Sequence, residues 1–261
     1  MKENMIIESH AHYDDEKFDE DRDILLCSLK EQGIEYVINV SASLDSAKKT
    51  LQLTEQYPFI YGSMGVHPEE TKELNEDNFV WLKEMCHKPK IVAVGEIGLD
   101  YYWDEPARDI QQKWFERQME LARDVKLPMI VHSRDAACDT LDMMKASKAH
   151  EIGGVIHCFS YPVEIAREFL SMGFYLGIGG VVTFSNAKKL KEVVEYAPLS
   201  SLLLETDCPY LAPVPNRGKR NSSLNLNYIA QEIATIKGIE YEEVVRVTSE
   251  NSRKMYSLTN H

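Results

Sequence analysis

The sequence predicts a closed barrel of parallel βα units in a single domain of residues 1–261. Three observations support this prediction. Short apolar segments recur along the chain, each followed by a longer amphipathic stretch. Polar residues follow most of these segments, as functional side chains do at the carboxyl ends of barrel strands. No GxGxxG or GxxxxGK[ST] phosphate loop is present, and no linker, repeat or low-complexity segment divides the chain.

The expected strands are eight short apolar segments, which are typical of buried parallel strands. They are Met5–Ile7, Tyr36–Val40, Phe59–Val66, Ile91–Val94, Met129–Val131, Val155–Ile156, Phe174–Ile178 and Leu202–Leu204. Apolar residues between them recur at three-to-four spacing, as in Phe79-Leu82-Met85, which indicates crossover helices. Two further helices are expected after the last strand, at Leu224–Lys237 and Glu240–Leu258.

An open, doubly wound sheet is the competing architecture, because periodicity alone does not separate it from a barrel. An open sheet concentrates its site at one switch point. Here the polar residues follow many different strands, which favours the barrel.

Composition narrows the class of protein. The chain has no run of about 18 apolar residues and no signal peptide, so a cytoplasmic protein without a membrane span is expected. Its five cysteines form no CxxC pair, which favours reduced thiols. The net charge of −13 disfavours stable, non-specific coating of nucleic acid but permits a local basic pocket.

Seven polar residues at predicted strand ends are candidate site residues. They are His10, His12, His67, Glu96, His132, His157 and Asp207, and they include five of the eight histidines. His10 and His12 are two residues apart, so both rings face the same side of an extended backbone. Any one of these histidines could be an ordinary hydrogen-bonded core residue, but their repetition indicates a metal site with nitrogen and oxygen ligands.

The donor set suits two divalent ions, of zinc, manganese, magnesium, cobalt or nickel. Glu96 is the natural bridge, since a carboxylate has two oxygens that can bind ions about 3.5–4 Å apart. One ion is expected at His10, His12 and Asp207, and the other at His132 and His157. Asp207 is the expected general base, acting with Glu96 to activate water for attack.

Basic and aromatic residues near these positions are candidate substrate contacts. Arg134 follows His132, and Arg217, Lys219 and Arg220 form a basic loop that could hold phosphates. His67 is a further candidate for substrate binding. Two alternatives stay open: the loop charges could only maintain solubility, and Arg134 could pair with Asp135 or Glu205. The run Tyr101-Tyr102-Trp103 could stack bases or pack against neighbouring loops.

These motifs resemble those of the TatD-type metal-dependent hydrolases, often called TatD DNases, over nearly the whole chain. The resemblance rests on Ser9-His10-Ala11-His12, Gly65-Val66-His67-Pro68, Gly95-Glu96-Ile97-Gly98-Leu99-Asp100-Tyr101, His132-Ser133-Arg134, His157-Cys158-Phe159-Ser160, Glu205-Thr206-Asp207-Cys208-Pro209-Tyr210-Leu211 and Arg217-Gly218-Lys219-Arg220-Asn221. It implies a TIM-type (β/α)8 barrel, with a binuclear metal centre at His10, His12, Glu96, His132, His157 and Asp207. It also implies the deoxyribonuclease activity reported for some members.

The chain departs from the family pattern at two places. Glu8 stands where the family usually has Asp, which keeps a carboxylate behind the ligands on a longer arm. Ser222-Ser223 follow Asn221 where the family usually has Glu-Pro. This second departure is expected to leave the rim after the last strand without a rigid turn.

The sequence therefore predicts a metal-dependent hydrolase that cleaves phosphodiester bonds of DNA 3′ ends or short nucleic acids, which bind as transient substrates. No membrane and no obligate protein partner are expected. An amidohydrolase or esterase acting on a small metabolite or aminoacyl ester is the alternative, because the same metal-activated water serves both chemistries. A partner-binding module with a vestigial site is a third reading, against which the complete ligand set counts.

Overall fold

The computed structural model describes residues 5–258. Within these residues, eight strands follow one another in sequence order in one sheet, and helices alternate with them along the chain. The chain contacts fall into two compact units. Unit 1 takes the described residues of Met1–Ile38, Cys158–Leu170 and Tyr175–His261, and unit 2 takes Asn39–His157 and Ser171–Phe174. The prediction of one domain over 1–261 stays a prediction.

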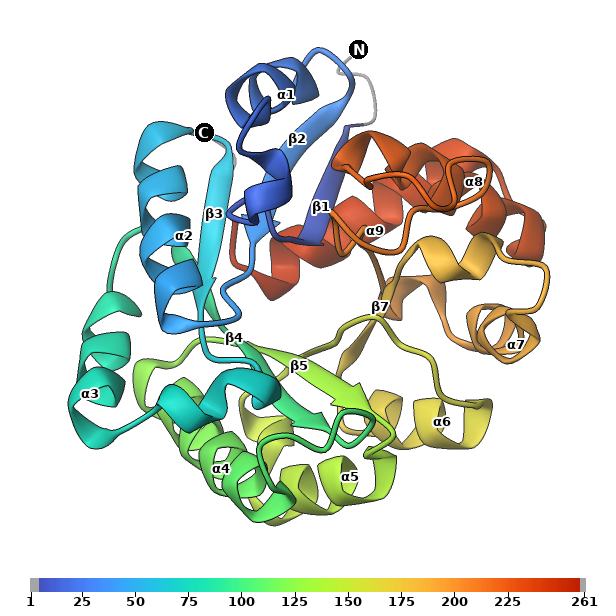
Figure 1. The fold of residues 1–261 in the computed structure, drawn as a ribbon. Helices are drawn as coiled ribbons and strands as arrows, with labels where there is room; N and C mark the ends of the chain where they lie inside the picture. Colours follow the sequence, from blue (N-terminus) through green and yellow to red (C-terminus); the bar gives the residue numbers. More distant parts are fainter. Residues whose placement is uncertain (1–4, 259–261) are drawn as a thin grey trace. The chain divides into compact units, whose positions relative to one another are not determined.

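Unit 1 holds the two ends of the described chain. Its strands are β1 (Ile6–Ala11), β2 (Ile34–Asn39, up to Ile38), β7 (Tyr175–Ile178) and β8 (Leu202–Leu204). Its helices are α1 (Arg22–Leu29), α6 (Val163–Ser171, up to Leu170), α7 (Lys188–Tyr196), α8 (Leu226–Lys237) and α9 (Tyr241–Met255). β7 and β8 pair in parallel, and a parallel bridge joins Ala11 to Cys208. α8 and α9 lie side by side, and α9 packs on β1 and β8 (Figure 1).

Unit 2 contains four strands that pair in parallel in sequence order. They are β3 (Ile60–Met64), β4 (Ile91–Asp100), β5 (Met129–Arg134) and β6 (Gly154–Ile156). Its helices are α2 (Leu44–Gln56), α3 (Glu76–Met85), α4 (Arg108–Val125) and α5 (Ala137–Ala146), and α4 runs along β4 (Figure 1). Gly98 of β4 has a φ of +145°, and a Cβ there would lie 1.9 Å from the carbonyl oxygen of His132. A glycine is therefore required where β4 approaches β5.

Short 3-10 helices complete the connections, at Glu16–Phe18, Pro68–Glu73, Ala149–Glu151, Gly180–Thr183, Leu199–Ser201 and Ser223–Asn225. Local sequence sets several helix ends. The Ser43 hydroxyl accepts a hydrogen bond from the backbone N–H of Ser46 at the start of α2, and α8 ends at Gly238, whose φ is +63°. No helix between residues 5 and 258 combines the length and the apolar character needed to cross a bilayer.

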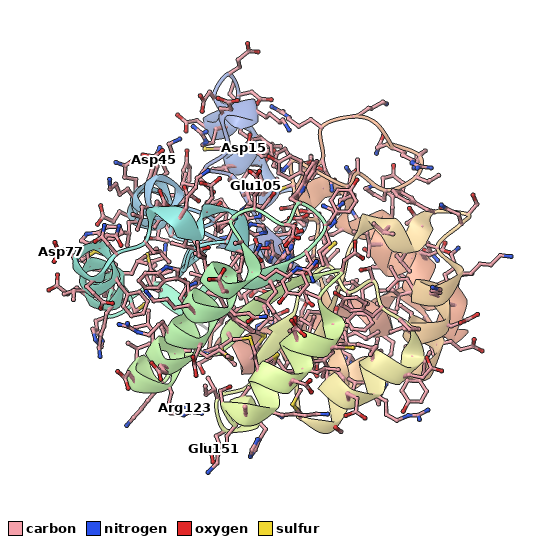
Figure 2. The ribbon with its side chains drawn as sticks, turned by 60° about the horizontal axis from the view of Figure 1, so that its bottom comes forward. Asp15, Asp45, Asp77, Glu105, Arg123 and Glu151 are labelled. Atoms are coloured by element: carbon pink, nitrogen blue, oxygen red, sulfur yellow. The ribbon has the colours of Figure 1, made fainter. Side chains whose placement is uncertain are left out.

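Several exposed charged residues lie on helices of unit 2. Figure 2 shows the exposed Asp45 of α2 and Asp77 at the start of α3, together with Arg123 and Glu151, whose charged groups form an ion pair of 3.9 Å. All four belong to unit 2. Exposed pairs of this kind contribute little to stability.

The structure confirms the two predicted C-terminal helices and the position of every predicted strand, but several strands are longer than their apolar runs. β1, β4 and β5 continue through His10, Glu96 and His132, so these residues lie within strands and do not follow them. The polar residues interrupt the apolar pattern without interrupting the extended backbone. His12, His157 and Asp207 do follow their strands.

Candidate metal centre

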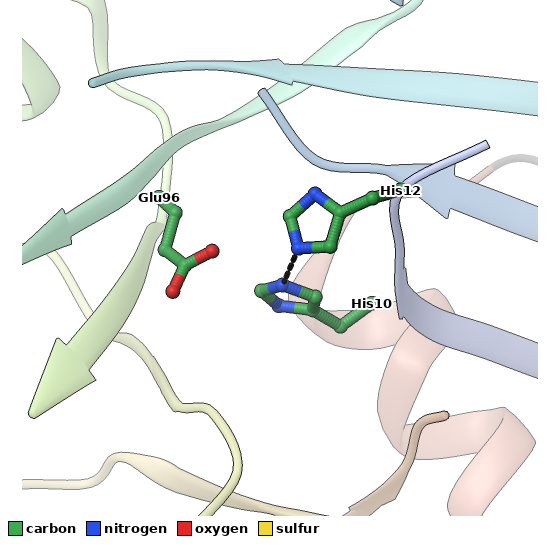
Figure 3. A group of neighbouring side chains, drawn as sticks. All are labelled: His10, His12 and Glu96. Carbon is green, nitrogen blue, oxygen red and sulfur yellow. Dashed lines mark hydrogen bonds between the residues drawn. The ribbon is translucent and has the colours of Figure 1, made fainter. Parts of the chain in front are cut away.

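In unit 1, three predicted ligands come together where β1 and β8 end. The Nε2 atoms of His10 and His12 are 3.1 Å apart (Figure 3). Oδ1 of Asp207 lies 3.3 Å from Nε2 of His12 and 3.7 Å from Nε2 of His10. His10 is fully buried, and the backbone N–H of Asp207 donates to its carbonyl oxygen, which fixes the two strand ends to each other. These three residues are the β1/β8 cluster.

The spacing in the β1/β8 cluster fits a cation. Three ligand atoms bound at about 2.1 Å around one tetrahedral ion are about 3.4 Å apart, which is close to the three separations found here. The ring nitrogens of two histidines approach each other and the same carboxylate oxygen. Imidazole nitrogens and a carboxylate oxygen are ligands that zinc and manganese accept.

Glu8 lies directly behind this cluster and is fully buried. Its carboxylate accepts hydrogen bonds from the backbone N–H and the hydroxyl of Thr206, at 2.8 and 2.6 Å, and from the backbone N–H of His10 at 3.3 Å. Burial raises the pKa of Glu8 from 4.5 to about 7, although these hydrogen bonds oppose the rise. Glu8 therefore ties the strand that carries His10 to the residue that precedes Asp207.

Replacing Glu8 with Gln should make folding stability less dependent on pH. Because the pKa is raised in the folded state, ionisation of Glu8 costs stability as the pH rises from 4.5 to about 7. The stability of Glu8→Gln relative to the native chain should thus increase by up to about 3 kcal/mol across this range. Urea unfolding of chelator-treated protein at pH 5 and pH 8 measures this, with the exposed Glu55→Gln as control. An equal difference at the two pH values would exclude this role.

Glu205 is a second buried carboxylate in unit 1, which the sequence suggested only as a possible partner of Arg134. It accepts a hydrogen bond from the backbone N–H of Cys158, the residue after His157. A Cβ on Gly177 would lie 2.2 Å from Oε2 of Glu205, so the glycine of β7 leaves room for this side chain. In the sequence, its position two residues before the predicted ligand Asp207 could have indicated a role near the site.

In unit 2, three predicted ligands form a second cluster, on β4, β5 and the end of β6. Glu96 is the third residue labelled in Figure 3. Its Oε1 atom lies 2.8 Å from Nδ1 of His132 and 2.7 Å from Nε2 of His157. The two ring nitrogens are 3.1 Å apart. Glu96 and His157 are buried and His132 is nearly so. These residues are the β4/β5 cluster, and their three donor atoms could hold one ion.

Asp100 stands behind His132, and the sequence reasoning gave it no role. Nε2 of His132 donates to Oδ2 of Asp100 at 3.0 Å, which directs Nδ1 towards Glu96 and His157. Burial lowers the pKa of His132, but its bonds to Asp100 and Glu96 outweigh this and raise the pKa to about 9. A carboxylate that orients a ligating histidine is a recurrent feature of metal sites. Asp100 lies four residues after Glu96 in the same strand, a spacing that places both side chains on one face of the strand. This spacing could have indicated from the sequence that Asp100 lies near the candidate ligands.

His67 joins the β4/β5 cluster from the end of β3. Its Nε2 atom lies 3.6 Å from Oε1 of Glu96, and its Nδ1 atom accepts a hydrogen bond from the backbone N–H of Glu69. Burial and the neighbouring His132 lower the pKa of His67 to about 3, so the ring is neutral. With Nδ1 as acceptor, the ring proton is on Nε2, beside the ligand atoms.

The four basic residues predicted to contact the substrate differ in their surroundings. Arg220 forms two hydrogen bonds to the carboxylate of Asp21 and stacks over Phe18, so it anchors the loop. The Arg217 guanidinium lies 4.4 Å over the ring of Phe184, and Lys219 is exposed. Among the described residues, Arg134 makes no salt bridge with Asp135 or another carboxylate. Its charge attracts the nearby carboxyl of Glu69, and its guanidinium lies 3.9 Å over the ring of Tyr102.

The segment after Asn221 makes local hydrogen bonds although it lacks the Glu-Pro pair of the family pattern. The backbone N–H of Ser222 donates to Oδ1 of Asn221, and the backbone N–H of Ser223 donates to the hydroxyl of Tyr13. The Ser223 hydroxyl also bonds to that of Tyr13, at 2.8 Å. These hydrogen bonds attach the start of this segment to Asn221 and Tyr13.

Comparison with known proteins gives a family match over nearly the whole chain. The model of the family described as TatD related DNase matches residues 7–257. The chain is 41% identical over 254 residues to the uncharacterized metal-dependent hydrolase YabD of Bacillus subtilis, covering 97% of this chain and all of YabD. It is 35% identical to the uncharacterized metal-dependent hydrolase YcfH of Escherichia coli, covering 97% of this chain and 96% of YcfH.

Solved structures show the same fold. The crystal structure of YjjV, a TatD homologue from Escherichia coli, is 28% identical with a TM-score of 0.93, covering 99% of this chain and 100% of YjjV. A TatD family hydrolase from Entamoeba histolytica is 27% identical with a TM-score of 0.88, covering 97% and 98% of the two chains. The predicted TIM-type (β/α)8 barrel is thereby confirmed, and the open sheet is excluded.

Proposed function

Because the chain belongs to the TatD-related DNase family of metal-dependent hydrolases, we propose that it is a divalent-metal-dependent phosphodiesterase that cleaves nucleotides from DNA 3′ ends or from short nucleic acids. The observation that carries the proposal is the β4/β5 cluster, in which Asp100 orients His132 so that its Nδ1 atom joins Glu96 and His157. Such a carboxylate–histidine pair supports a metal ligand.

Two divalent ions are proposed, as the sequence predicted. His10, His12 and Asp207 would hold one, and Glu96, His132 and His157 would hold the other. When bound, such ions lower the pKa of water and neutralise charge on a phosphoryl group. The candidate ions are zinc, manganese, magnesium, cobalt and nickel.

The protein's own groups supply the remaining chemistry. Asp207, whose carboxylate is partly exposed, would accept a proton from the attacking water. The Nε2–H group of His67 would donate to a phosphoryl oxygen, since its other nitrogen is occupied by Glu69. Arg134, which makes no salt bridge among the described residues, would hold a phosphate, with Arg217 and Lys219 as further phosphate contacts. Arg220 would act indirectly, by holding the basic loop against Asp21.

A metal-titrated activity assay tests the proposed function. Chelator-treated protein, resupplied separately with each of the five metals, is assayed on single-stranded DNA, bis(4-nitrophenyl) phosphate and a panel of amides and carboxylic esters. We expect metal-dependent cleavage of both phosphodiesters. Cleavage of DNA should weaken steeply as salt rises, because Arg and Lys contacts to phosphates are screened. Cleavage of amides or esters without phosphodiester cleavage would replace this proposal with the amidohydrolase alternative.

A further inference from the structure

The loop after β4 presents two exposed aromatic side chains. Tyr102 is 55% exposed and Trp103 is 58% exposed. Their rings meet edge to face, with centroids 5.0 Å apart and planes at 88°. Whichever of the two rings contributes its edge to this T-shaped contact, Tyr102 leaves at least one face of the Trp103 ring uncovered. Two adjacent large aromatic rings on the surface leave apolar area in water that folding could have buried, which calls for an explanation.

The loop is anchored by other residues, so packing does not explain the exposed pair. The hydroxyl of Tyr101 donates to Asp139 at 2.7 Å and accepts from Gln112, and Arg108 stacks over its ring. Tyr101 thus performs the structural role of the aromatic run. Figure 2 labels Glu105, which is exposed on the same loop.

A guanidinium completes the aromatic group. Arg134 lies 3.9 Å over the ring of Tyr102, and the backbone N–H of Tyr101 donates to the carbonyl oxygen of Arg134 at 2.9 Å. Because Asp100 and Arg134 are also register partners, the end of β5 and the start of the loop are held together. Arg134 makes no salt bridge in residues 5–258, although it attracts the nearby carboxyl of Glu69: burial raises the pKa of Glu69, and Arg134 opposes that rise. A ring face and an available guanidinium therefore lie within one short segment.

Asp100 couples this segment to the β4/β5 cluster. Its Oδ1 atom accepts hydrogen bonds from the backbone N–H groups of Tyr102 and Trp103, at 2.9 and 3.2 Å. Its Oδ2 atom accepts from His132. Burial raises the pKa of Asp100, but these bonds outweigh it and hold the pKa below its usual range. One carboxylate thus fixes both a candidate metal ligand and the aromatic pair, so the two keep a defined relation.

We propose that Tyr102, Trp103 and Arg134 form a subsite for an unpaired nucleobase and its phosphate, next to the bond that is cleaved. A base has an aromatic face that stacks on Trp or Tyr, and its phosphate carries the charge that Arg134 would bind. A base in a duplex is already stacked and paired, so this subsite selects single-stranded ends. The inference rests on the proposed function and adds the feature of the substrate that is recognised.

Binding of matched oligonucleotides separates stacking from charge. The purified full-length protein is titrated with two fluorescein-labelled ten-nucleotide strands, measured by fluorescence anisotropy. One is oligothymidine and the other is abasic, and both carry phosphorothioate linkages that resist hydrolysis. We expect the native protein to bind oligothymidine about 5- to 150-fold more tightly than the abasic strand, the range for stacking one base. Trp103→Ala should remove most of this ratio and Trp103→Phe should retain much of it.

The exposed Tyr228 of α8 provides the matched control, because it is 43% exposed and is not part of the subsite. Tyr228→Ala should bind both strands as the native protein does. Equal affinity of the native protein for the two strands would overturn the inference, and so would an unchanged ratio in Trp103→Ala. If either result is obtained while the native protein still cleaves bis(4-nitrophenyl) phosphate, the proposed subsite is wrong and the proposed function is unaffected. Absence of phosphodiester cleavage defeats the proposed function separately.

Discussion

Asp207→Asn is expected to lower kcat on bis(4-nitrophenyl) phosphate by about 1,000-fold or more while the protein stays folded. The substitution replaces a charged oxygen that lies 3.3 Å from Nε2 of His12 with an amide. It removes both a ligand charge and the group proposed to accept the proton, and loss of a general base alone costs about 100- to 10,000-fold. Asp207 has a φ of +56°, a backbone conformation that Asn adopts readily, so the loop should keep its shape.

The chain offers a matched control at Asp135. It also has a positive φ, of +53°, follows a strand and is exposed, but it belongs to neither cluster. Asp135→Asn should therefore retain native activity. Metal content by elemental analysis and thermal unfolding should accompany both variants, so that loss of the ion is separated from loss of the fold. Near-native kcat in Asp207→Asn would remove Asp207 from the mechanism.

The alternation of apolar segments located every strand because buried parallel strands need apolar side chains on both faces. It misplaced the ends of β1, β4 and β5, since His10, Glu96 and His132 continue the extended backbone with polar side chains. Hydrophobicity indicates which side chains are buried away from water, whereas the length of a strand depends on how far its backbone hydrogen bonds continue. Strand ends are therefore misjudged from an apolar pattern where polar residues, such as these candidate ligands, continue the strand.

The ligand candidates were predictable because several residues of metal-binding type recur at corresponding places along the chain. Their supporting residues were harder to predict. Asp100 and Glu205 are single carboxylates among 42 acidic residues, and only the structure shows that each is buried and accepts a hydrogen bond. Arg220 shows the opposite case, since its basic neighbours suggested a phosphate contact whereas its guanidinium binds Asp21. Sequence supplies the chemical type of a side chain, and folding decides its partner.

Asn221→Ala is expected to destabilise the protein by about 3 kcal/mol, which corresponds to a Tm decrease of roughly 5–10 °C. Asn221 is fully buried, and its amide donates to the carbonyl oxygens of Thr206 and Tyr210, at 3.0 and 2.8 Å. Its Oδ1 atom accepts from the backbone of Ser222 and the side chain of Asn225. Alanine would leave these groups without partners in a site that water cannot readily fill, and each such group costs about 1–3 kcal/mol.

Asn216→Ala separates this role from a general effect of loop substitution. Asn216 lies in the same loop, is only partly buried, and its side chain makes one hydrogen bond, to Oδ1 of Asn225. Its loss should cost about 1 kcal/mol. Because Asn221 binds the carbonyl of Thr206, the residue before Asp207, Asn221→Ala should also lower kcat at temperatures where the variant is fully folded. Equal stability of the two variants in urea unfolding would show that Asn221 does not hold the end of β8, and the position of Asp207 would then depend on its backbone bond to His10 and on the contacts of Glu8 with Thr206.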